Sequence, residues 1–120
     1  MKNATSITCV FACGSRETLQ RAEQLARAES DLDNVFDDVA VVYPDGIETR
    51  TTIRHRLGDY FDNVQVVARQ SAEFPSLVLV FQPRHGARRH WKDIMDQILE
   101  SISESFEDVS IASIEKSKIG

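Results

Sequence analysis

The stretch "SLVLVFQ", residues 76–82, decides the fold, because it is a continuous apolar run between Pro75 and Pro83. A strand with one wet face alternates apolar and polar residues, whereas a strand that is covered on both faces reads as an unbroken apolar run. The run therefore predicts a central, fully buried strand. Two amphipathic helices packed on its sheet are the simplest way to cover it.

The segment that follows, residues 87–106, predicts the best helix of the chain. Its apolar residues recur every three or four positions, which places them on one broad face. Trp91, the only tryptophan, belongs to this face and is predicted to lie in the core or an interface. The face consists of Trp91, Ile94, Met95, Ile98, Leu99, Ile102 and Phe106.

The charges of this helix oppose its own dipole, which is positive at the N-terminus and negative at the C-terminus. Three explanations stay open. The acidic segment 29–38 neutralises the basic turn, an external anion binds there, or the charges form a solvated face without a role. The basic residues at the start are Arg88, Arg89, His90 and Lys92, and the acidic residues at the end are Glu100, Glu104, Glu107 and Asp108.

The N-terminal run "SITCVFAC", residues 6–13, predicts a second buried strand that ends at Gly14-Ser15. A helix over residues 16–29 follows, with Ser15 as its N-cap. The two cysteines, Cys9 and Cys13, are four residues apart on this strand, too far for a disulfide, and are predicted to be buried, free thiols. A phosphate-binding turn at Gly14-Ser15 and a nucleophilic Cys13 are weaker hypotheses, because the glycine-rich fingerprint and a placed base are missing.

The middle of the chain begins with an acidic loop, predicted over residues 31–38. Pro44-Asp45-Gly46 then predicts a hairpin turn, with Gly46 supplying a positive φ, between strands 38–43 and 47–51. Residues 52–71 fit either one helix or a short helix followed by a strand, and the second reading is slightly favoured. The boundaries of that second reading are 53–61 for the helix and 64–70 for the strand.

The C-terminal residues 108–117 predict an edge or late strand, with a frayed tail from Lys116 onward. The whole chain, residues 1–120, is expected to form a single globular domain. Its fold class is α+β, with α/β as the alternative: a mixed β-sheet of about five to six strands covered by two or three helices. The expected order is β-α-β-β-(α/β)-β-α-β.

Composition narrows the function. The chain has 14 lysines and arginines against 19 aspartates and glutamates, a formal net charge of -5. That balance argues against a general nucleic-acid-binding protein, whose footprint is basic. A signal peptide and an apolar run of membrane-spanning length are both missing, so a small cytoplasmic protein is expected, without membrane contact. His85 and His90 lack a third ligand at a normal spacing, so no metal and no cofactor are predicted.

These features favour a non-catalytic binding protein that neutralises or inhibits a basic protein partner, as acidic antitoxin and immunity proteins do. The alternative is an anion- or nucleic-acid-binding regulatory module that uses the arginine clusters at 50–56 and 84–92. An enzyme and a purely structural subunit are less favoured, and a homodimer stays open. The partner-binding candidates are Glu29, Asp31, Asp33, Asp37 and Asp38; the anion-binding candidates are Arg54, Arg56, Arg84, Arg88, Arg89 and Lys92.

Overall fold

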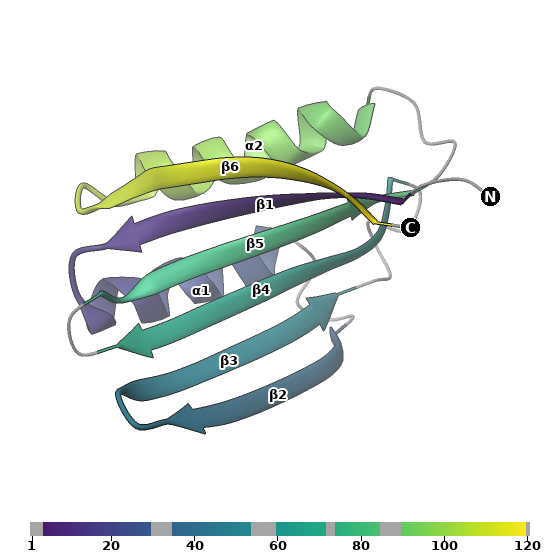
Figure 1. Cartoon of the computed structure of the whole chain (residues 1–120). Coiled ribbons are helices and arrows are strands. Elements are labelled where there is room, and N and C mark those ends of the chain that lie inside the picture. The colour runs from purple at the N-terminus through teal and green to yellow at the C-terminus, as the bar shows by residue number, and fades with distance from the viewer. Residues whose placement is uncertain (1–3, 30–34, 54–59, 72–73, 85–89, 120) are drawn as a thin grey trace.

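The computed structural model describes residues 4–29, 35–53, 60–71, 74–84 and 90–119. Two helices and six strands lie in these residues (Figure 1). In chain order they are β1 (Ala4–Cys13), α1 (Arg16–Glu29), β2 (Val35–Tyr43), β3 (Gly46–Ile53), β4 (Phe61–Ser71), β5 (Ser76–Pro83), α2 (His90–Ser105) and β6 (Val109–Ile119).

The six strands form one sheet in the order β2-β3-β4-β5-β1-β6. Every neighbouring pair is antiparallel, so the fold is α+β and the sheet is antiparallel rather than mixed. The strands β4, β5, β1 and β6 with the two helices make the split β-α-β arrangement. The β2–β3 hairpin is inserted between α1 and β4 and widens the sheet beyond that arrangement.

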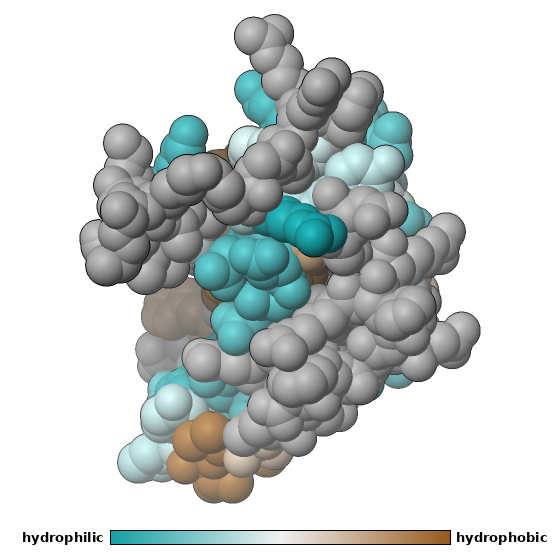
Figure 2. All heavy atoms as spheres, turned by 90° about the vertical axis from the view of Figure 1, so that its right-hand side faces the viewer, coloured by the Kyte–Doolittle hydropathy of each residue, from teal (hydrophilic) through white to brown (hydrophobic). Residues whose placement is uncertain are grey.

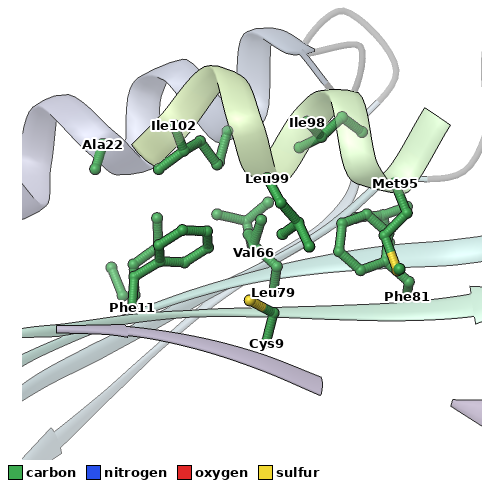
Figure 3. Packing of buried hydrophobic residues seen from close by; sticks show 14 of the residues in the cluster. Cys9, Phe11, Ala22, Val66, Leu79, Phe81, Met95, Ile98, Leu99 and Ile102 are labelled. Carbon is green, nitrogen blue, oxygen red and sulfur yellow. The ribbon is translucent and has the colours of Figure 1, made fainter. Parts of the chain in front are cut away.

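The core lies between the sheet and the two helices, as Figure 3 shows. Phe11, Val66 and Leu79 point from three neighbouring strands toward Ile98 and Ile102 of α2. Leu79 and Ile98 are both buried, as the sequence predicts. The apolar face expected for the last helix is confirmed, and Trp91 packs edge-on against Phe61 with ring centroids 6.5 Å apart.

The strand β5 occupies the central position that its sequence predicts, but it is not fully buried. Leu77, Leu79 and Phe81 face the core, while Val78 and Val80 on the other face are only half-buried. Val78 lies between Val10 and Val67 in the register. Neighbouring strand side chains therefore shield this face in part, and no described helix covers it.

The helix α1 has the predicted bounds, and its cap is observed. The backbone N–H of Thr18 donates a hydrogen bond of 3.1 Å to the Ser15 hydroxyl. The described part of α2 spans His90–Ser105, and the first three residues of the predicted helix, with Arg88 and Arg89, lie outside the described residues. Its first turn also contains Asp93, which suits the dipole, while its last turn has no basic residue.

The middle of the chain is a strand. β4 spans Phe61–Ser71, which confirms the strand expected over 64–70 and rules out one helix over 52–71. The alternation of Val64, Val66 and Ala68 prevails because it places all three side chains in the core. The short helix expected over 53–61 falls mainly outside the described residues, and its two ends, Ile53 and Phe61, belong to strands.

Two expectations about strand boundaries are wrong. The acidic loop 31–38 is already strand from Val35, with Asp37 and Asp38 paired opposite Thr52 and Thr51 on β3. The expected tail at Lys116 is part of β6 and pairs with Ile7.

The glycine at the hairpin turn is needed for space rather than for a positive φ. Gly46 lies outside the left-handed region, and a Cβ at this position would lie 1.6 Å from the carbonyl oxygen of Gln70. The strand β3 approaches β4 so closely here that only glycine fits.

Candidate protein-binding surface

The β2–β3 hairpin extends the sheet beyond the helix layer (Figure 1). The helix α1 packs mainly on β4, β5 and β1, and α2 packs mainly on α1 and β6. The hydroxyl of Thr49 on β3 donates a 2.5 Å hydrogen bond to Glu23 of α1, at the border of the covered area. Strand residues beyond that border have no helix over them among the described residues.

Apolar side chains are exposed on this hairpin. Val42 is 77% exposed and Ile47 is 42% exposed, and the two residues are directly opposite each other, so they share one face. Val41 and Tyr43 are exposed on the opposite face. Figure 2 shows hydrophobic atoms at the bottom of the molecule, the side on which Figure 1 places β2.

The same hairpin is acidic. Residues 35–53 contain four carboxylates and one guanidinium, a formal charge of -3 out of -5 for the whole chain. The hairpin therefore combines exposed apolar side chains with a charge that attracts cationic partners. The charged residues are Asp37, Asp38, Asp45, Glu48 and Arg50.

An arginine of the neighbouring strand fixes the hairpin turn. Arg69 of β4 contacts Asp45 at 2.6 Å, and its guanidinium lies 3.8 Å from the centre of the Tyr43 ring. The ion pair and the cation–π contact are both partly exposed, so each contributes modestly. Together they hold the end of β2 and the turn against the sheet.

Among the described strands, β2 has a free edge, because it stands at one end of the strand order and pairs with β3 alone. Such an edge presents unpaired backbone N–H and C=O groups to a binding partner. The register with β3 is regular from Asp37 to Tyr43, and its one irregularity lies between Val35 and Asp37.

The acidic residues predicted to bind a partner are only partly gathered in one place. Asp37 and Asp38 lie in β2, on the free edge. Glu29 ends α1 and accepts a 3.2 Å hydrogen bond from Ser101 of α2, which places it in the helix layer rather than in the sheet. Asp31 and Asp33 lie outside the described residues.

Of the predicted anion-binding residues, two are described. Arg84 is exposed directly after β5, and Lys92 is exposed in the first turn of α2. The backbone N–H of Arg84 donates a 2.9 Å hydrogen bond to the carbonyl of Tyr60. The other four lie outside the described residues: Arg54, Arg56, Arg88 and Arg89.

The turn before α1 is occupied by the chain's own carboxylate. The hydroxyl of Thr18 donates a 2.9 Å hydrogen bond to Asp108, and a Cβ on Gly14 would lie 2.6 Å from that carboxylate. The Gly14 N–H donates to the Asp108 carbonyl at 2.9 Å. An Asp carboxylate beside this N-terminus places negative charge where a phosphate would bind, which argues against the phosphate-turn hypothesis.

Neither cysteine has the properties of a nucleophile, because the pKa of each thiol is raised rather than lowered. Burial, and then the negative charge of Asp108, raise the pKa of Cys13. Burial raises the pKa of Cys9 to about 11. Both thiols are free and buried, as predicted, and both stay protonated at neutral pH. Within the described ranges, no group of three or more His, Cys, Asp or Glu side chains is placed to hold a metal ion.

Sequence reasoning missed the exposed apolar residues of the hairpin. Val41 and Val42 belong to a β-prone run that resembles a core strand, and Phe74, although a large apolar residue, is 76% exposed. One signal was available in the partner strand. The segment "IETRTT", residues 47–52, is polar at every position except Ile47, so both faces of the strand carry polar residues. This pattern is typical of a strand that no helix covers.

Neither a protein-family model nor a curated protein sequence matches this chain. None of the helices in the described part of the chain is long and apolar enough to span a membrane.

Proposed function

We propose that this protein is a non-catalytic binding protein that neutralises or inhibits a basic protein partner, and that it binds this partner with the β2–β3 hairpin. One observation carries the proposal. The hairpin lies beyond the helix layer and exposes Val42 and Ile47 on a segment with a formal charge of -3. Antitoxin and immunity proteins are proteins of this functional type.

The two properties of the hairpin have separate roles in this proposal. Val42 and Ile47 supply apolar area, worth roughly 25 cal/mol for each Å² that the partner removes from water. The carboxylates accelerate the encounter with a basic surface and select against acidic partners. Asp37 and Asp38, two of the residues expected to bind the partner, are assigned the electrostatic role.

The proposal is tested by selecting a phage-displayed random peptide library on the intact protein. We expect the enriched peptides to combine a net positive charge with apolar residues. Their affinity is expected to fall at least tenfold with the Val42→Ser/Ile47→Ser double variant. Enrichment of acidic peptides, or of peptides that bind this variant normally, would overturn the proposal.

The other edge of the sheet supplies a matched control. Ile111 and Ile114 of β6 are 41% and 53% exposed, similar to the hairpin residues. The Ile111→Ser/Ile114→Ser variant removes a comparable apolar area, yet is expected to bind the enriched peptides as the unchanged protein does. An equal loss in both variants would show that exposed apolar area alone, rather than the hairpin, selects the peptides.

The electrostatic role has its own readout. Asp37→Asn together with Asp38→Asn is expected to slow association with an enriched peptide and to flatten the salt dependence of that rate. Stopped-flow fluorescence measures the rate, and chemical denaturation checks that the free energy of unfolding is unchanged. A normal association rate in this variant would remove the assigned role of the two aspartates.

A second candidate function rests on the hydrogen bond between Arg84 and Tyr60. This bond joins the first residue of the segment 84–92 to Tyr60, which follows the segment 50–56 by four residues in the sequence. In this alternative the protein is an anion- or nucleic-acid-binding module. Retention on heparin that falls steeply with salt, and that Arg84→Ala and Lys92→Ala weaken, would favour it over the hairpin proposal.

A further inference from the structure

We infer that the partner contributes an extended basic segment, which adds to the free edge of β2 as an antiparallel strand. The inference rests on the proposed function and specifies how the hairpin binds. It follows from the backbone of β2, from a comparison with the other edge, and from the distribution of charge along the strand.

The backbone of β2 is a suitable template. In an antiparallel pair, alternate residues direct their N–H and C=O groups to the neighbouring strand, and the residues between them direct these groups outward. The strand β2 is nine residues long, and within the part of the chain that the structure describes it pairs on one side only. Residues 40–43 are exposed, and the pairing with β3 is regular beside them. The outward groups of this half are therefore accessible in a regular row.

The opposite edge is less suited to adding a strand. The pairing of β6 with β1 shifts register between Ile111 and Ser113, and the pairing of β2 with β3 shifts between Val35 and Asp37, so both edges keep a regular row. The two rows differ in charge. The regular part of β6 contains Lys116 and Lys118 against Glu115, and lysines on an edge strand oppose the addition of a cationic strand.

Charge argues against a second copy as the added strand. If two β2 strands paired antiparallel over their full length, Val39 would face Val39, and Asp38 would face Ala40. The two Asp38 residues would then be diagonal neighbours, about 7–8 Å apart, with both Asp37 residues further from the two-fold axis. Such a pair gathers four carboxylates on one ribbon, whereas lysine or arginine directly opposite an aspartate stabilises strand pairing. The edge therefore favours a cationic segment.

The order of residues along β2 gives the partner segment a direction. The strand runs from the acidic pair Asp37 and Asp38 to the apolar residues Val41 and Val42. Every neighbouring pair in the sheet is antiparallel. An added antiparallel strand therefore begins with its apolar half, opposite the C-terminal half of β2, and ends with its lysines or arginines opposite the aspartates.

The test uses an acetylated, amidated peptide of the length of β2, Thr-Val-Thr-Val-Thr-Lys-Lys-Val-Thr. Full pairing places its two lysines opposite Asp38 and Asp37 and its first valine opposite Val42. Two derivatives are N-methylated at the even or at the odd interior positions, which removes the donors of one peptide edge only. A third peptide has the reversed sequence and the same composition.

Strand addition predicts an asymmetric result. One N-methylated derivative is expected to bind at least tenfold more weakly than the parent, and the other to bind like the parent, because only one peptide edge faces β2. The reversed peptide is expected to bind more weakly than the parent. Fluorescence anisotropy gives the affinities. Amide hydrogen exchange is expected to show new protection at β2, at Ala40 or Val42, when the parent peptide is present.

The outcomes separate this inference from the proposed function. If both N-methylated derivatives bind like the parent while Val42→Ser/Ile47→Ser weakens all three, the hairpin binds the peptide and strand addition is wrong. If the hairpin variant binds the parent normally, the proposed function fails as well. If the parent peptide does not bind at about 1 mM, the inference that a basic, extended segment adds to β2 is wrong. A dimer in sedimentation that Val42→Ser/Ile47→Ser breaks would assign the edge to a second copy instead.

Discussion

Two parts of the same sheet are treated very differently by this fold. The strands β1, β4 and β5 bury one face under the helices, with Leu79 and Phe11 in the core (Figure 3), whereas the β2–β3 hairpin leaves Val42 and Ile47 in water. Both parts contain β-branched, apolar runs. Whether an apolar side chain of this sheet is buried therefore depends on whether a helix lies over its strand. The inserted hairpin extends past the strands on which α1 packs, so its apolar side chains stay exposed.

The covered strands and the hairpin therefore differ in what they contribute: the covered strands stabilise the domain, and the hairpin exposes side chains to solvent. The covered strands hold the large buried side chains, which supply most of the apolar burial of a domain. The hairpin is joined to them through β4, the Thr49–Glu23 hydrogen bond and the Arg69 contacts. Substitutions in the two parts should therefore differ in kind as well as in size.

The largest expected difference lies between a core residue and a hairpin residue of similar chemistry. Leu79→Ala and Ile98→Ala are each expected to lower the free energy of unfolding by about 2–5 kcal/mol, because each leaves a cavity in a packed core. Val42→Ala should change it by no more than about 0.5 kcal/mol, since an exposed side chain leaves no cavity. Urea denaturation of the three variants measures this. A loss at Val42 equal to that at Leu79 would break the comparison.

Gly46→Ala tests the attachment of the hairpin. The new Cβ would meet the Gln70 carbonyl, a backbone atom that cannot turn away, so β3 and β4 must separate. The expected cost is about 1–3 kcal/mol. Hydrogen exchange should show lost protection in β2 and β3, with β1 and β5 kept. Gly14→Ala is the control for location, because its Cβ would meet the Asp108 side chain in the turn before α1, with 2.8 Å to the Asp108 Cβ. Its loss of protection is expected around that turn, and lost protection in β2 and β3 in both variants would contradict this account.

Alkaline pH should weaken the covered part through its buried thiol. The pKa of Cys9 is raised from 9.0 to about 11, so the folded protein binds this proton more tightly than the unfolded chain does. Stability is therefore unaffected below about pH 9 and falls as pH rises from 9 toward 11. The loss is about 1 kcal/mol near pH 10. Denaturation of the Cys9→Ala variant over the same pH range should lack this component, and an identical fall in that variant would contradict the assignment.

The smallest effect is expected at the hairpin turn. Arg69→Ala removes the Asp45 ion pair and the Tyr43 contact, both partly exposed, and should cost about 0.5 kcal/mol. Its local effect should be larger than its global one, with faster exchange of the amides around Tyr43 and Gly46. Arg21→Ala, which breaks the exposed helical pair with Glu17 at 3.0 Å, is the control and should leave the hairpin amides unchanged.

The sequence predicted most of the covered part and little of the exposed part. The spacing of apolar residues predicts helix 16–29, the central positions of the two apolar runs, and the burial of Leu79 and Ile98. This spacing indicates which side chains need apolar neighbours. Periodicity does not report how far a helix layer reaches across a sheet. For that reason the exposure of Val42 and Phe74 could not be predicted from their own residue types.

The candidate site was predicted in its charge but not in its shape. Asp37 and Asp38 were expected to bind a partner from their charge alone, and the structure places them on a free strand edge that a loop assignment could not foresee. The argument against a phosphate turn at Gly14-Ser15 comes from a long-range contact. The carboxylate beside this turn, Asp108, is 90 residues away in the chain from Thr18, to which it is hydrogen-bonded.

The pairing of β1 has a consequence for how this protein is made. Among the described elements β1 is synthesised before the others, yet both of its sheet neighbours, β5 and β6, come late in the order. Until those two strands are made, Cys9 and Phe11 lack the strands that flank them in the finished sheet. The core therefore closes only after β6 has been synthesised, and non-local pairing of this kind is typical of domains that fold slowly. Until then the nascent N-terminal strand is an apolar, unpaired segment of the kind that chaperones protect from aggregation.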